Sequence, residues 1–235
     1  MSGIDVQFIP LDDYINAYSP EGLCFANGMI YIGEQSTYKV HMFAYPSFKY
    51  LGYIDIGSNY HSPTGILVTR EYLYVVDPVN GRYGAYNLST GSFDYESSNG
   101  WIPGASGLAL APVFTSRTTF MSWVWDEAKY YTFNRDATGL TTVNLPNNTG
   151  LTAVQSILMA PGGAYILVYD IEEATAFIRW NPHDDEIEAV WKCTDLKAPE
   201  GADIISVRKR RIIVGKEKII NQRQGVLIID GFPLL

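Results

Sequence analysis

The chain has 235 residues, of which 47% are hydrophobic and 18% charged, and its formal net charge is −8. This composition is too apolar for a disordered chain, and the length suffices for a large core. The acidic balance argues against general binding of phosphate backbones, so we expect no nucleic-acid partner.

The first predicted strand is the apolar run at residues 4–9, which has no neighbouring run to pair with. Similar segments then recur along the chain. Residues 19–23 (Ser-Pro-Glu-Gly-Leu) resemble residues 62–66 (Ser-Pro-Thr-Gly-Ile), and their glycines are 43 residues apart. Glu34 and Asp77, which end similar Tyr- and Ile- or Val-rich runs, are also 43 residues apart. A repeat of this length indicates stacked or radially arranged structural units.

Later units open near residues 104, 154 and 201, and successive second strands end 43, 49, 44 and 46 residues apart. Each unit reads as four short β-branched and aromatic runs bounded by Gly, Pro and Asn. No stretch of ten residues shows a 3.6-residue period, so helix should be scarce. In the fifth unit we expect strands at about 204–207, 211–215 and 226–230, with no fourth strand after them.

Four strands per unit and a period of 43–49 residues predict an all-β fold, a five-bladed β-propeller of four-stranded antiparallel blades. We expect a single domain, 1–235, with blades at about 11–57, 58–100, 101–146, 147–193 and 194–235. The N-terminal strand within residues 1–10 would complete the last blade, because a ring without it would leave open strand edges.

The repeats resemble the NHL and YVTN types of β-propeller, most clearly over residues 19–95. The segment from Tyr74 to Arg82 (Tyr-Val-Val-Asp-Pro-Val-Asn-Gly-Arg), followed by Thr90-Gly91, is similar to their Tyr-Val-x-Asp-x-x-Asn-x-Arg pattern. The resemblance implies the fold and carries little information on activity.

Charged residues recur where the second strand of each unit ends: Glu34, Asp77, Asp126, Asp170 and Lys216. One interpretation is that each side chain caps the loop that follows. The other is an acidic collar at the mouth of the central channel that binds a ligand. Ca²⁺ takes six to eight oxygen ligands, more than one carboxylate per blade supplies. We therefore predict no metal site and no cofactor, with Ca²⁺ at the collar as the alternative.

Loops on the same face as the collar carry His61, Tyr38 and Tyr60, which we add to the candidate ligand-binding residues because tyrosines stack on sugars and anchor partners. On the opposite face, a hairpin carries the basic cluster Arg208, Lys209, Arg210 and Arg211. It is either a solvated turn or a docking site for an acidic partner.

The chain has three histidines without metal-ligand spacing, and it contains no nucleophile elbow, phosphate-binding loop or Cys-x-x-Cys pair. This favours a non-catalytic recognition or assembly module that binds a protein partner or a glycan. A virion accessory, spike or tail protein within a larger assembly would fit this description. The alternative is a hydrolase or lyase that acts on a sugar or lactone from the collar. No catalytic residue is predicted.

No apolar run approaches the ~18 residues that span a bilayer, and the start lacks a basic segment followed by an apolar one. We expect neither membrane insertion nor a signal peptide, and a cytoplasmic or virion-associated location. Cys24 lies in an apolar run and should be a core residue. Its pairing with Cys193 is left open.

Overall fold

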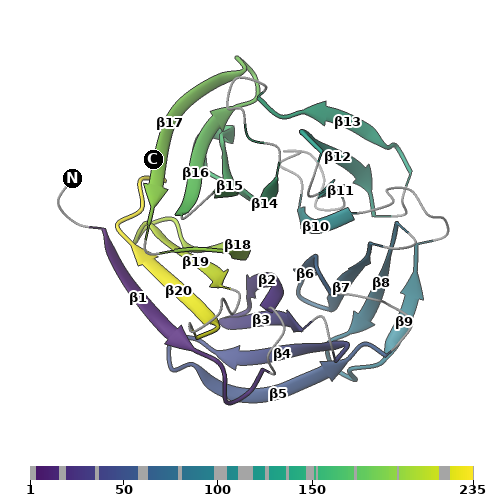
Figure 1. Cartoon of the computed structure of the whole chain (residues 1–235). Coiled ribbons are helices and arrows are strands. Elements are labelled where there is room, and N and C mark those ends of the chain that lie inside the picture. Colours follow the sequence, from purple (N-terminus) through teal and green to yellow (C-terminus); the bar gives the residue numbers. More distant parts are fainter. Residues whose placement is uncertain are drawn as a thin grey trace.

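The computed structural model describes residues 4–15, 20–34, 37–57, 63–78, 81–97, 105–110, 119–124, 127–135, 138–146, 151, 153–171, 174–194, 196–216 and 223–234. The described strands form five four-stranded sheets arranged in a ring (Figure 1). Each sheet is antiparallel, and its strands follow one another from the centre of the ring outward (Figure 1). The chain is a five-bladed β-propeller, as the repeats predict.

Four blades are continuous in sequence. The first comprises β2 (Pro20–Ala26), β3 (Met29–Glu34), β4 (Lys39–Ala44) and β5 (Lys49–Asp55). The second comprises β6 (Ile66–Val68), β7 (Tyr72–Asp77), β8 (Arg82–Asn87) and β9 (Phe93–Glu96). The third comprises β10 (Ala105–Leu110), β11 (Thr119–Val124), β12 (Lys129–Asn134) and β13 (Thr141–Asn144). The fourth comprises β14 (Val154–Met159), β15 (Tyr165–Ile171), β16 (Ala174–Asn181) and β17 (Glu186–Cys193).

The fifth blade joins the two ends of the chain. It comprises β18 (Pro199–Ser206), β19 (Arg211–Lys216), β20 (Gly225–Asp230) and, outermost, β1 (Asp5–Pro10). Val6 pairs with Ile229 and Ile9 with Val226, so β1 lies antiparallel to β20 along the outside of the ring (Figure 1). A Cβ at Gly225 would lie 2.2 Å from the carbonyl oxygen of Ile9, so this approach requires glycine. The predicted closure is confirmed.

Five buried apolar clusters fill the spaces between neighbouring blades. The second strand of a blade contributes side chains to the clusters on both faces of that blade. In β3, Ile30 and Ile32 pack toward the fifth blade, whereas Tyr31 packs toward the second. Such two-sided burial explains why these strands read as continuous apolar runs and not as alternating ones.

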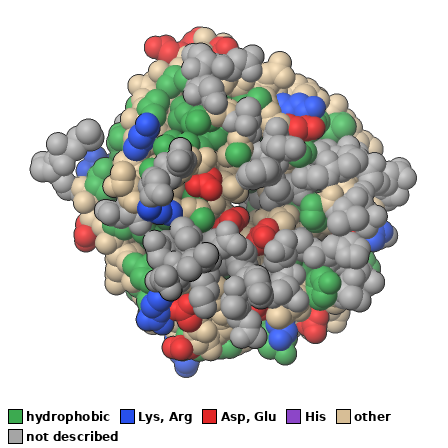
Figure 2. Space-filling view, viewed as in Figure 1, with side chains coloured by type: hydrophobic (Ala, Val, Ile, Leu, Met, Phe, Trp, Pro, Cys, Tyr) green, Lys and Arg blue, Asp and Glu red, His purple; other side chains and the backbone are tan. Residues whose placement is uncertain are grey.

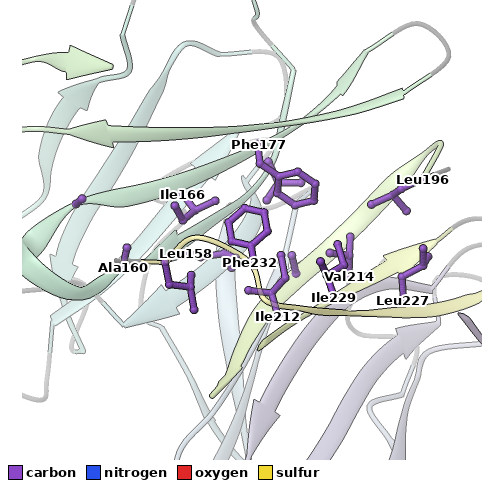
Figure 3. Close-up of a cluster of buried hydrophobic side chains, with 14 residues drawn as sticks. Leu158, Ala160, Ile166, Phe177, Leu196, Ile212, Val214, Leu227, Ile229 and Phe232 are labelled. Atoms are coloured by element: carbon purple, nitrogen blue, oxygen red, sulfur yellow. The ribbon is translucent and has the colours of Figure 1, made fainter. Parts of the chain in front are cut away.

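The C-terminal segment seals the space between the fourth and fifth blades (Figure 3). Phe232 contacts the rings of Phe177 and Trp191 edge-on, at centroid distances of 5.1 and 5.2 Å. Leu234 is fully buried in the same cluster. Residues that follow the last strand therefore contribute to the core that holds the ring closed.

The structure extends one expected strand. The innermost strand of the fifth blade begins at Pro199, before the expected residue 204, because Ala202 and Asp203 pair with Val214 and Ile213 of β19. This difference places Asp203 on an inner strand of the ring.

Helix is scarce, as expected: the described helical segment is the 3-10 turn η2 (Pro161–Gly163). In the described part of the chain, no helix has the length and apolar character that a membrane crossing needs. Cys24 is buried, as expected, and no disulfide joins Cys24 and Cys193.

Candidate functional site

The innermost strands of the five blades surround the centre of the ring (Figure 1). Residues of all five blades line a cavity of about 260 Å³ there. We call it the central cavity. Apolar side chains such as Leu23, Ile66 and Leu158 form most of its wall. A liquid water molecule occupies about 30 Å³, so the space has room for a molecule of several heavy atoms.

Polar groups enter the wall at a few points. The Ser156 hydroxyl donates to the carbonyl of Ala202 and accepts the amide N–H of the same residue, both at 3.2 Å, which joins β14 to β18. Thr64 also lines the cavity, and its hydroxyl oxygen is buried with no hydrogen-bond partner among the described residues. A buried hydroxyl without a partner costs about 1–3 kcal/mol, so it marks a place where a bound molecule would be favoured.

Trp123 lines the cavity from the third blade. Its indole lies over Gly107 of β10, where a Cβ would be 1.9 Å from two indole carbons. Glycine at this position therefore lets the indole approach the innermost strand.

Asp203 is the one charged side chain among the described residues that line the cavity. Its Oδ2 accepts the amide N–H of Phe25 on β2, and its Oδ1 accepts that of Ile204, both at 2.7 Å. The carboxylate thus bridges the fifth and first blades. A carboxylate offers about four lone-pair sites, so two amide bonds leave it able to accept more donors.

Asp203 also departs from the internal repeat. It pairs with Ile213, which lies three residues before the collar position Lys216; in the other blades the same count back from Glu34, Asp77, Asp126 and Asp170 gives the equivalent position. The equivalent partner in the other four blades is an uncharged residue: Cys24, Leu67, Gly107 or Ile157. All four also line the cavity. A charge at one of five equivalent inner positions breaks a local rule of the fold, and such departures concentrate at functional sites.

Burial raises the pKa of Asp203 from 3.8 to about 6, because desolvation outweighs the hydrogen bonds from Phe25, Ile204 and Cys24 that favour the charged form. The carboxyl is therefore mainly ionised at pH 7. Burial also raises the pKa of the Cys24 thiol, and the negative charge of Asp203 adds a smaller increase. Cys24 stays a protonated thiol at neutral pH, which makes it a poor nucleophile.

Asp203 is expected to make stability depend on pH. Because its pKa is higher in the folded protein than in the unfolded chain, its contribution is fully present below pH 4 and is lost as pH rises toward 6. Wild type should thus lose up to about 3 kcal/mol relative to Asp203→Asn between pH 4 and pH 7, at 1.36 kcal/mol per unit of pKa. This is an upper bound, because solvent partly reaches the side chain. Urea unfolding of both proteins across this range measures the difference, and parallel curves would contradict it.

Among the residues at the ends of the second strands, Glu34, Asp77 and Asp170 have different surroundings. Glu34 is buried and pairs with His41, whose Nε2 is 2.9 Å from Oε2 of Glu34. Asp77 is fully buried and pairs with Arg82, whose Nε is 3.3 Å from Oδ2 of Asp77. Asp170 is exposed. Asp126 and the side chain of Lys216 lie outside the described residues. Ligand binding at a collar stays a prediction.

The loop-capping interpretation fits the geometry in a modified form. Glu34 accepts a hydrogen bond from the hydroxyl of Thr37 in the following loop, and Arg82 stands at the far end of the loop that Asp77 begins. These contacts come from side chains, whereas the sequence suggested backbone donors. Each carboxylate nevertheless ties the loop that follows its strand.

Glu34, His41 and Tyr50 form a chain of contacts across β3, β4 and β5. His41 Nδ1 is 3.1 Å from the Tyr50 hydroxyl. Burial lowers the pKa of His41, although Glu34 acts in the opposite direction. A neutral ring that donates from Nε2 to Glu34 leaves Nδ1 to accept the Tyr50 hydroxyl, so every member of the chain has a partner.

Tyr50→Phe should lower the free energy of unfolding by about 1–2 kcal/mol, because it removes the hydroxyl that donates to buried His41 Nδ1. Tyr53→Phe is the matched control: Tyr53 is half-exposed on the same strand, and its loss of a hydroxyl should change stability by less than about 0.5 kcal/mol. Chemical denaturation measures both. Equal effects would show that His41 does not depend on Tyr50.

The remaining ligand-binding candidates are Tyr38, Tyr60 and His61. Tyr38 packs against the cluster between the first and second blades, and its carbonyl accepts the amide N–H of Ile56 at 2.9 Å. His61 and Tyr60 lie outside the described residues. A role for these three in ligand binding stays a prediction.

The basic hairpin joins β18 to β19. Arg208, Lys209 and Arg210 are exposed, as a docking site requires. Arg211 differs, because its Nη2 donates to Oδ2 of Asp230 at 2.7 Å and its Nη1 donates to the Tyr45 hydroxyl. Arg211 therefore has a structural role between β19, β20 and the first blade. Partner docking on the exposed residues stays a prediction.

In the described part of the chain, no three His, Cys, Asp or Glu side chains gather in a way that would hold a metal ion. Asp203 was not predicted as a site residue, because the innermost strand of the fifth blade was expected at about 204–207 and begins at Pro199. A signal was present: β2, β6, β10, β14 and β18 together contain no Lys, Arg or His, and Asp203 falls at a position that is uncharged in the other four blades.

No protein-family model matches this chain, and no curated protein matches it in sequence. Solved structures with a similar fold include glutaminyl cyclase from Myxococcus xanthus, with a TM-score of 0.69, 13% identity and 96% of each chain covered. The nidogen/laminin complex matches with a TM-score of 0.59 and 13% identity, over 92% of this chain and 86% of that one. Hydrazine synthase from Kuenenia stuttgartiensis matches with a TM-score of 0.54 and 13% identity, over 92% of this chain. This chain spans 64% of the length of that hydrazine synthase chain. At these identities the likeness shows the propeller fold.

Proposed function

We propose that the protein is a recognition module that binds a small molecule in the central cavity. The observation that carries this proposal is the cavity itself: about 260 Å³ lined by residues of all five blades, with mainly apolar walls and a few polar groups. Small-molecule sites have this character, and they form preferentially where several structural elements meet.

The polar groups of the wall support binding at a defined orientation. Asp203 offers a charged acceptor, and Thr64 offers a buried hydroxyl without a partner among the described residues. Both lie within walls that are mainly apolar. A ligand that satisfies both groups would gain directional bonds in addition to apolar contact.

Binding is favoured over turnover. Among the lining residues, the titratable groups are Asp203 and Cys24, and the raised pKa of Cys24 keeps the thiol protonated. A nucleophile paired with a base is therefore missing from the described wall. The alternative of a hydrolase or lyase at the collar gains no support from Asp77, which is fully buried and paired with Arg82.

Filling the cavity tests the proposal. Met159 lines the cavity and is 39% exposed, so Met159→Trp adds bulk at the cavity without disturbing the core. Leu51→Trp is the matched control, since Leu51 is 46% exposed on the outer strand β5. Wild type and both variants are screened in a thermal-shift assay against cationic, anionic and uncharged fragments.

We expect fragments that raise the melting temperature of wild type and of Leu51→Trp but not of Met159→Trp. A ligand at 100 times its Kd stabilises by about 2.7 kcal/mol, which corresponds to roughly 5–10 °C for a domain of this size. Fragments that stabilise all three proteins equally, or no stabilising fragment at all, would contradict the proposal.

A further inference from the structure

We infer that the ligand of the central cavity is a small organic ammonium ion, held by the carboxylate of Asp203 and enclosed by the apolar walls. This inference rests on the proposed function and adds the charge and chemical class of the ligand. It begins from the charges that the innermost strands carry.

The charged side chains of the innermost strands are all negative. They contain three carboxylates, Glu21, Glu200 and Asp203, and no Lys, Arg or His. All three lie on the neighbouring strands β2 and β18. Figure 2 shows Asp and Glu side chains around the centre of the ring on the face in view. Of the three, Asp203 lines the cavity, and in a narrow space with low-dielectric walls a charge attracts and concentrates ions of the opposite sign.

Asp203 lacks a positive counterpart within the described cavity wall. Its described partners are the amide N–H groups of Phe25 and Ile204 and the Cys24 thiol, all of them neutral. A half-buried carboxylate has lost part of its hydration, and a ligand cation would offset this cost on binding. The wall therefore favours a cation over a neutral molecule of the same shape.

The walls also distinguish an organic cation from a metal ion. Ca²⁺ needs six to eight oxygen ligands, and next to Asp203 the wall presents Leu23, Phe25 and Ile204. Apolar walls suit the carbon atoms of an alkylammonium group. Trp123 adds an indole to the same cavity, and aromatic rings attract cations of this kind.

Choline and 3,3-dimethyl-1-butanol test the charge directly, because the two molecules have the same shape and differ in the positive charge. Isothermal titration is carried out on wild type, Asp203→Asn and Asp13→Asn. Asp13 is an exposed carboxylate away from the cavity, so its variant controls for the loss of one negative charge. Calcium chloride serves as the metal probe.

We expect Asp203→Asn to bind choline on the order of 10- to 100-fold more weakly than wild type does. Asp13→Asn should bind choline with the affinity of wild type. Wild type should also prefer choline over the uncharged alcohol, a comparison that needs no variant. Equal binding of the two molecules, no binding of choline, or an Asp203-dependent response to calcium would each overturn the inference. The proposed function fails separately, if no fragment of any charge distinguishes wild type from Met159→Trp.

Discussion

Deleting residues 1–10 is expected to lower the free energy of unfolding by about 3–5 kcal/mol. The deletion removes all of β1, which makes six antiparallel residue pairs with β20. It also removes Val6 and Ile9, which pack against the two clusters on either side of the fifth blade. A fully buried aliphatic side chain contributes about 1.5–3 kcal/mol, and each lost hydrogen bond about 0.5–1.5 kcal/mol. Domains are stable by only about 5–15 kcal/mol, so the effect is large.

Thermal unfolding followed by circular dichroism measures this loss, which corresponds to a fall of roughly 6–20 °C in melting temperature. The matched control is deletion of residues 1–4, which leaves every residue pair of β1 in place. A peptide of residues 4–11 added to the longer deletion should restore stability, because it can pair with the exposed edge of β20. Equal melting temperatures for the two deletions would contradict closure by β1.

Phe232→Ala is expected to cost about 3–5 kcal/mol, the usual range for removing a buried phenylalanine ring. Phe232 is buried between the fourth and fifth blades, where it contacts Phe177 and Trp191 (Figure 3). Its amide also donates to the carbonyl of Arg210 at 2.9 Å. The variant leaves a cavity at the interface that closes the ring.

Phe93→Ala controls for the loss of a phenylalanine ring on the surface, since Phe93 is 49% exposed on the outer strand β9. Its cost should be well below that of Phe232→Ala. Urea unfolding compares the two free energies. A small effect of Phe232→Ala would mean that the C-terminal segment does not hold the last interface together.

The architecture was predictable because the same sequence pattern recurs five times along the chain. The equal spacing of Gly22 and Gly65, and of Glu34 and Asp77, is enough to define the length of the repeating unit. The unpaired run that forms β1 and the missing fourth strand of the last unit then predict the closure. Repetition makes up for the weak signal that any single short strand carries.

The site was harder to predict because its residues are close only in the folded ring. The carboxylate of Asp203 accepts the amide N–H of Phe25, which is 178 residues away in the sequence, and no spacing rule connects the two residues. The collar was inferred from equivalent strand ends, but a position in the repeat does not reveal local partners. Glu34 has His41 beside it and Asp77 has Arg82, so the same position serves internal pairs in two blades.

The structural roles of single residues also depend on contacts that the pattern does not contain. Arg211 belongs by sequence to a basic cluster, yet it pairs with Asp230 on the next strand. The exposed part of that cluster, Arg208 to Arg210, retains the character that the sequence indicates. The residues of this cluster therefore differ in exposure, and the exposed ones remain the candidates for partner docking.

The most direct test of a cation site at the centre of the ring is a crystal structure with (2-bromoethyl)trimethylammonium, located by the anomalous scattering of bromine. We predict a bromine peak within the cavity enclosed by β2, β6, β10, β14 and β18, with the ammonium group beside the carboxylate of Asp203. The peak should be absent from crystals of Asp203→Asn. Bromine bound only on the outer surface of the blades, or bound in the cavity of both proteins alike, would contradict this account.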